Sequence, residues 1–169
     1  MINEVNGLPA HVLLVHVVVV LVPLAALLTV LAAVWPAARR RLGIITPLAG
    51  LAALIVVPIT ANAGEWLQVR LPRSPLINEH VGLGLTMIWF AIGLFVASLL
   101  AWGVPTLIVR RTRQAPPPWV GVVVAIVAVV LAGAAVFQVF RVGESGSRAV
   151  WTGSFCPVPY SADGTCPAS

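Results

Sequence analysis

Charged residues are scarce in this chain of 169 residues: 9% of its positions are charged, against 60% that are hydrophobic. Soluble domains carry charge at about a quarter of their positions. Water therefore cannot be the main solvent of this chain, and a soluble globular fold is excluded.

Lysine is absent, and all ten basic residues are arginine. Six of them form two clusters, in residues 39–41 and 110–113, and each cluster connects two long apolar runs. The positive-inside rule places such connections in the cytoplasm. Neither cluster has interleaved aromatic residues or a recognisable binding motif, so nucleic acid is not expected as a partner despite the net charge of +5.

Cysteine is nearly absent too, with only Cys156 and Cys166 in a polar tail after the last apolar run. If that tail is extracytoplasmic, the two cysteines lie in an oxidising compartment, where such pairs form disulfides. A metal site is a poorer explanation, because two cysteines without a nearby histidine are an incomplete ligand set. We expect a disulfide in a tail of residues 152–169.

Long apolar runs dominate the rest of the chain. Four of them exceed or approach the roughly 20 residues that a helix needs to cross a bilayer. They predict helices at about 11–35, 43–63, 80–104 and 119–140. The expected fold is all-α, a four-helix transmembrane bundle over residues 1–151. With the arginine clusters inside, both termini are extracytoplasmic, and the protein is expected to cross a bacterial-type cytoplasmic membrane.

Few polar groups remain, and they gather at the predicted outer end. All five acids fall on that side: Glu4, Glu65, Glu79, Glu144 and Asp163. The three histidines do so as well, with His11 and His16 on the first helix and His80 at the start of the third. His11 and His80 are expected at nearly the same depth in the membrane, because both lie where their helices begin. His16 is about 7.5 Å deeper than His11 and about 140° around the helix, so only one of the two can share a ligand face with His80.

Three explanations of this outer cluster stay open. A b-type haem would use His80 with either His11 or His16 as axial ligands. A metal ion would use Glu65 with His11 and His80. In the third explanation no haem or metal is bound, and the histidines and glutamates cap helix ends and face water. The serines and glycines of GESGS, residues 143–147, are expected to form a turn after the last helix rather than a nucleophile site, and the chain is not expected to be an enzyme on its own.

The fourth predicted helix has a seam of small residues, which permits close approach of membrane helices. The seam consists of Gly121, Ala125, Ala128, Ala132 and Ala135. Two hypotheses follow for function. The chain is a redox-associated membrane module that binds haem b or a metal, or it is a non-catalytic accessory or assembly subunit, docked through this seam to a larger respiratory-type membrane complex or to another copy of itself.

Internal repetition is not assigned from the sequence. The first and third helices both begin near a histidine, and the second and fourth both end in a polar stretch with a glutamate. That likeness alone is too small to establish a repeat.

Three segments resemble the signatures of domain of unknown function 2231, a family of predicted four-helix membrane proteins. They are GLPAHVLLVH in the first helix, ITANAGEWL with INEHVGLG around the second loop, and FRVGESGSRAVW near the C-terminus. By position, the resemblance points to His11, His16, Thr60, Gly64, Glu65, His80, Gly143, Gly146 and Trp151. Some related proteins join such a domain to a Rieske iron–sulfur domain, which implies a redox setting. This tail has two cysteines and no histidine, so it cannot hold a Rieske cluster.

Overall fold

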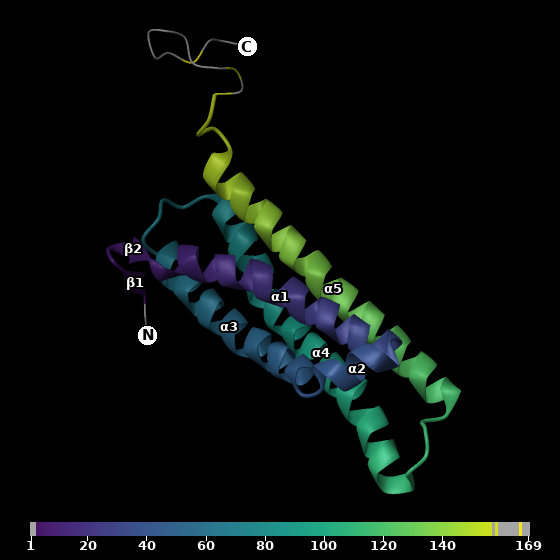
Figure 1. Cartoon of the computed structure of the whole chain (residues 1–169). Coiled ribbons are helices and arrows are strands. Elements are labelled where there is room, and N and C mark those ends of the chain that lie inside the picture. Colours follow the sequence, from purple (N-terminus) through teal and green to yellow (C-terminus); the bar gives the residue numbers. More distant parts are fainter. Residues whose placement is uncertain (1–2, 157, 159–165, 167–169) are drawn as a thin grey trace.

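Four long helices form an antiparallel bundle in the computed structural model, which describes residues 3–156, 158 and 166 (Figure 1). The long helices are α1 (Ala10–Val34), α3 (Ile45–Gln68), α4 (Pro75–Thr112) and α5 (Pro118–Trp151). A short helix α2 (Pro36–Leu42) follows α1, and a two-stranded hairpin of β1 (Glu4–Val5) and β2 (Leu8–Pro9) precedes it. All four long helices are long and apolar enough to span a membrane.

Helices α4 and α5 are longer than the sequence predicted. With 38 residues, α4 is about 57 Å long at 1.5 Å per residue, so it extends beyond a hydrocarbon core of about 30 Å. It starts with Pro75 in its first turn, where a missing N–H costs nothing. The predicted turn at residues 143–147 is wrong, because α5 continues through it to Trp151. Apolar runs mark only the part of a helix in lipid, and the backbone hydrogen bonds continue past it.

The first arginine cluster lies on α2 rather than in an irregular loop. Pro36 opens this helix, and Gly43 follows it with a positive φ of 51°, a conformation that favours glycine. Partial burial, with repulsion from Arg40 as the smaller cause, lowers the pKa of the Arg39 guanidinium. An arginine remains charged despite such a shift, so α2 keeps its strong positive charge.

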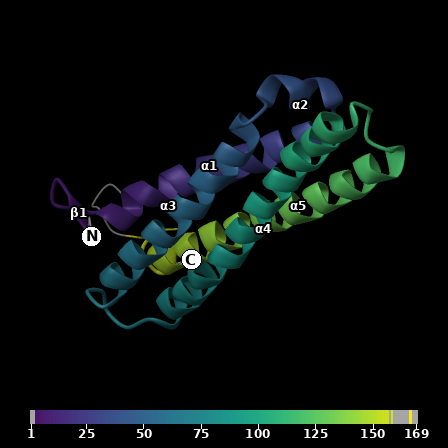
Figure 2. The same cartoon turned by 90° about the horizontal axis from the view of Figure 1, so that it is seen from below.

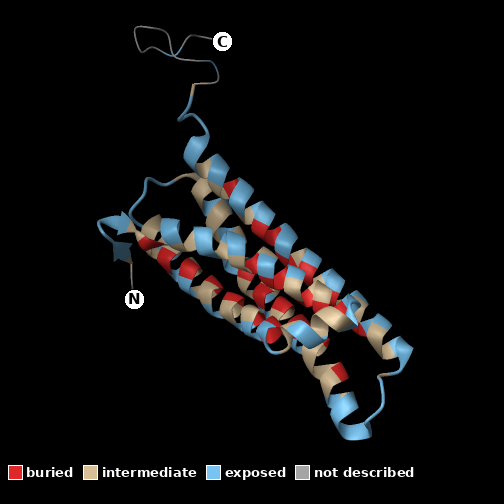
Figure 3. Cartoon of the chain, viewed as in Figure 1, coloured by how far each residue is buried: buried red, intermediate tan, exposed pale blue. Residues whose placement is uncertain are grey.

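Small side chains line the centre of the bundle, where most of the buried hydrophobic residues are alanine (Figure 3). The main cluster draws on all four long helices, with Ala25 of α1, Ala53 of α3, Leu94 of α4 and Ala135 of α5 among its members. Large side chains point outward instead. Close helix packing therefore replaces the large apolar core of a soluble protein, and the outer surface is suited to lipid.

The small-residue seam of α5 packs inside the bundle. Ala128 is 0% and Ala132 2% exposed, and Ala128 joins a second cluster with Ala32 and Ala101 of the neighbouring helices. The prediction that Gly121, Ala125, Ala128 and Ala132 form a docking face is therefore wrong, because the alanines are covered by this chain's own helices. The prediction of a packing face is confirmed.

The four described glutamates gather at one end of the bundle, together with Arg70, Arg73, Arg141 and Arg148, whereas the other six arginines lie at the opposite end. Glu65 lies near the end of α3, Glu79 near the start of α4 and Glu144 near the end of α5, and these termini meet at one end. The hairpin before α1 and the end of α5 lie there too (Figure 1). The opposite end holds α2 with its three arginines, and the end of α4 with Arg110 and Arg111, followed by Arg113. Asp163 is outside the described residues.

The tail carries the expected cysteine pair. The sulfur atoms of Cys156 and Cys166 lie at bonding distance, with their Cα atoms 5.7 Å apart. The two cysteines therefore lie at the distance that the predicted disulfide requires.

Candidate histidine site

His11 of α1 and His80 of α4 meet at the end of the bundle that holds the glutamates. Their ring centroids are 6.1 Å apart and the ring planes are inclined by 72°. Both side chains are half-buried. The bundle therefore brings together two of the three histidines, from helices that lie diagonally opposite each other.

The ring of His11 is held by α3. Its Nδ1 atom lies 3.0 Å from the carbonyl oxygen of Thr60. A methyl group on Gly64 would lie 2.9 Å from Cε1 and 3.0 Å from Nδ1 of this ring. Only glycine leaves room for the imidazole at that position, so α3 both orients the ring and accommodates it.

The ring of His80 is held in the same way by α5. Its Nδ1 atom lies 3.1 Å from the carbonyl oxygen of Val142 and 3.1 Å from Oγ of Ser145. The Ser145 hydroxyl donates to the same Val142 carbonyl at 2.9 Å. A methyl group on Gly146 would lie 3.0 Å from Cε1 of the ring. His80 thus has one more polar contact than His11.

These contacts determine which ring nitrogen carries the proton. A carbonyl oxygen can only accept, so Nδ1 of His11 and Nδ1 of His80 must both be the donors. In a neutral imidazole the other nitrogen, Nε2, then has a free lone pair. Histidines that bind metals have this arrangement, in which the second nitrogen donates to a carbonyl and fixes the tautomer.

His16 does not join the pair. Its side chain is exposed, and Nδ1 lies 2.7 Å from the carbonyl oxygen of Val12, one turn earlier on its own helix. The expected angular separation from His11 is confirmed. Because this hydrogen bond lies within α1, it lowers the free-energy cost of placing a polar ring on the outer surface of the bundle.

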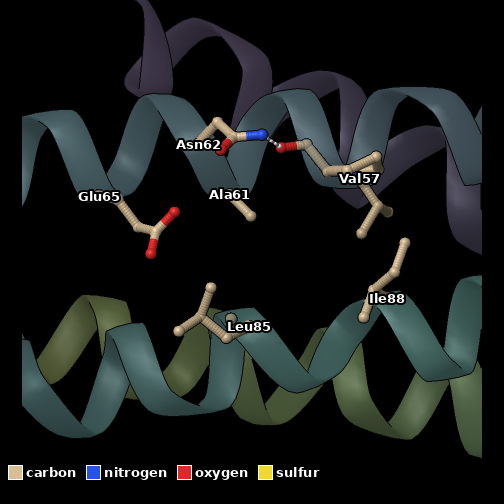
Figure 4. Close-up of a pocket in the computed structure, with 8 residues that line it drawn as sticks. Val57, Ala61, Asn62, Glu65, Leu85 and Ile88 are labelled. Atoms are coloured by element: carbon tan, nitrogen blue, oxygen red, sulfur yellow. Dashed lines mark hydrogen bonds between the residues drawn. The ribbon is translucent and has the colours of Figure 1, made fainter.

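Glu65 lies on another side of α3, where it lines a groove between α3 and α4 of about 200 Å³ (Figure 4). Its carboxylate points into the groove across from Leu85. The other groove residues are mainly apolar, and neither His11 nor His80 is among them. Within the described part of the chain, no three His, Cys, Asp or Glu side chains are grouped so as to hold a metal ion.

The remaining polar groups of α5 serve packing or face water. Gln138 is buried and donates through Nε2 to the Leu83 carbonyl and to Oγ1 of Thr86. Glu144 pairs with Arg148 on the exposed side of the helix.

The sequence reasoning missed how the rings are held. Ser145 was assigned to a turn, and the two carbonyl acceptors have no side-chain signature. Gly64 and Gly146 were marked only by the family resemblance, and their role as spaces for the histidine rings required the packed helices.

Comparison with known proteins agrees with this architecture. No curated protein and no solved structure matches the chain. A family model described as predicted membrane protein (DUF2231) matches residues 7–155. The four apolar helices and the histidine pair all lie inside that range. The chain belongs to the DUF2231 family of predicted membrane proteins.

Proposed function

We propose that this protein is a membrane module that binds a transition-metal centre between Nε2 of His11 and Nε2 of His80. The observation that carries the proposal is the pair of Nδ1 contacts to backbone carbonyls on two different helices. Each contact leaves one imidazole nitrogen available as a ligand, and the bundle holds both rings in place before any metal arrives.

The ring separation is compatible with two imidazole ligands of one metal. A metal–nitrogen bond of about 2.0 Å, with the ring centre about 1.1 Å further back, gives centroids about 6.2 Å apart for opposite ligands and about 5.1 Å for tetrahedral ones. The observed 6.1 Å is close to the first value. Opposed imidazoles suit haem iron, to which a porphyrin supplies the other four ligands, or a copper ion of low coordination number.

The two sources of the metal differ in the space that they need. An ion fits between the rings, whereas a porphyrin also needs a flat space around them. The groove at this end of the bundle includes neither histidine. Haem binding would therefore need space beyond this groove. In either case a bound centre would supply electron transfer, and the residues of this chain hold and orient the two imidazoles.

Orientation in the membrane is part of the proposal. The arginines of α2 and those at and just after the end of α4 support a cytoplasmic position for that end. The histidine pair, both termini and the cysteine pair would then lie at the outer face of a bacterial-type cytoplasmic membrane.

The test uses the full-length protein purified in a mild detergent, after reconstitution with haem or with a copper or zinc salt. Absorbance in the Soret region identifies haem, and elemental analysis identifies a metal ion. The variants His11→Ala and His80→Ala should each lose the bound centre. His16→Ala is the matched control, because His16 is on the same helix as His11 with the same kind of Nδ1 contact, and it should retain the centre.

Glu65→Gln separates the two sources further. A free ion that recruits the carboxylate should bind more weakly to this variant, whereas a bis-imidazole haem should be retained with a shifted potential. A folded wild-type protein that takes up neither haem nor metal would overturn the proposal. So would equal retention by the His11, His16 and His80 variants.

A further inference from the structure

The two histidine contacts follow one pattern. In each, the ring lies against a glycine of the next long helix, and Nδ1 approaches the carbonyl four residues before that glycine. The three members are His11, Thr60 and Gly64 in the first half of the chain, and His80, Val142 and Gly146 in the second. The two contacts therefore use the same ring atom and the same four-residue spacing between the carbonyl and the glycine on the supporting helix.

Helices α1 and α4 share four fully buried positions when they are aligned on their histidines. A shift of 69 positions (80 − 11) maps His11 onto His80. The same shift pairs Val22 with Ala91, Ala25 with Leu94, Thr29 with Ser98, and Ala32 with Ala101. All eight of these residues are 0% exposed. Thr29 and Ser98 are both hydroxyl residues that donate to a carbonyl of the preceding turn.

Helices α3 and α5 agree in the same manner when they are aligned on their glycines. A shift of 82 positions (146 − 64) maps Gly64 onto Gly146. It pairs Thr46 with Ala128, Gly50 with Ala132, Ala53 with Ala135, Val57 with Val139, and Ala63 with Ser145. All ten are buried. The spacing of these pairs is that of one helix face turned toward the core. Aligning the helices on the residues of the histidine site therefore brings the inward faces of both helix pairs into the same register.

The packing of the helices has the matching symmetry. α1 contacts α3 and α5, and α4 contacts the same two helices, while α1 and α4 touch across the bundle (Figure 2). A rotation by half a turn about the bundle axis exchanges α1 with α4 and α3 with α5. It keeps every helix direction, so the halves are parallel repeats about an axis along the membrane normal.

We infer that the chain consists of two parallel two-helix repeats, α1–α3 and α4–α5, and that each repeat supplies one half of the histidine site. Gly64 and Gly146 are the positioning residues of the two halves. A centre shared by both rings would lie on the pseudo-twofold axis and would contact the halves equally. The inference stands on the protein alone and holds whether or not a metal binds.

The experiment follows the ring nitrogens in full-length protein labelled with ¹⁵N-histidine, in detergent and with a chelator present. Long-range ¹H–¹⁵N spectra distinguish a protonated from an unprotonated ring nitrogen. Both His11 and His80 should show the Nδ1–H tautomer. Gly64→Ala should displace the His11 ring and abolish its single tautomer while the His80 signals change less. Gly146→Ala should do the reverse.

Two glycines with open space around them provide matched controls. Gly143 is on α5 three residues before Gly146, and Gly82 is on α4 two residues after His80. A methyl group on either would meet nothing within 4 Å. Gly143→Ala and Gly82→Ala should leave both tautomers unchanged, which separates displacement of a ring from a general effect of alanine.

A milder variant tests the equivalence if the glycine variants fail to fold. Ser145 and Ala63 occupy equivalent positions, and Ser145 provides the extra contact of His80. Ser145→Ala should shift the His80 Nδ1 resonance toward that of His11. If Gly64→Ala and Gly146→Ala leave their own rings in the Nδ1–H tautomer, or if Ser145→Ala moves the two resonances apart, the repeat does not form two equivalent halves.

Discussion

Gly50→Ala should weaken the contact between α3 and α4. A methyl group at this position would lie 2.5 Å from Oγ of Ser98 and 3.2 Å from Cα of Phe95. The hydroxyl can rotate away, but the Phe95 backbone can move only with the helix, so α3 and α4 must separate slightly. Overpacking of this kind costs about 1–3 kcal/mol. Alanine recovers about 0.5–1 kcal/mol relative to glycine within a helix, so from the middle of the two ranges the net loss of unfolding free energy should be about 1 kcal/mol.

A titration with sodium dodecyl sulfate in mixed micelles, followed by circular dichroism, measures this loss. Gly84→Ala is the control, because a methyl group there meets nothing within 4 Å, and its unfolding free energy should equal or exceed that of the wild type. Adding Ser98→Ala to Gly50→Ala removes the nearest contact but leaves the Phe95 backbone, so the double variant should recover only part of the loss. Wild-type stability of Gly50→Ala would refute the close packing of these two helices.

Two further predictions concern the buried glutamine and the tail. Gln138→Leu keeps the volume of the side chain but removes its hydrogen bonds to the Leu83 carbonyl and to Thr86. In the same titration it should lower the unfolding free energy by about 0.6–1.7 kcal/mol. An unchanged midpoint would show that Gln138 does not link α5 to α4. Thiol alkylation of protein from intact membranes, read by mass spectrometry without reductant, should leave the wild type unmodified and label Cys166 in Cys156→Ser, because the two sulfurs are paired. Two reactive thiols in the wild type would contradict both the disulfide and the outward position of the C-terminus.

The sequence by itself determined the features that depend on local composition. Apolar length alone predicted four helices able to span a membrane. The clustering of arginine separated one end of the bundle from the other, and two cysteines in a polar tail predicted their pairing. Each of these properties belongs to a single segment and its solvent, so no knowledge of neighbouring helices was needed.

The tertiary structure decided which faces of the helices meet. It selected His11 over His16 as the neighbour of His80, because the packing turns one face of α1 inward and the other toward lipid. It placed the small-residue seam of α5 inside the bundle, and it continued α5 through residues 143–147, where local glycines and serines had predicted a turn.

The repeat was also visible only after packing. The paired positions of its halves share burial more often than residue type, as Val22 and Ala91 or Gly50 and Ala132 illustrate. Helix packing in a membrane requires small residues at contact points but accepts several types there. The two halves can therefore keep the same geometry around His11 and His80 while their sequences differ.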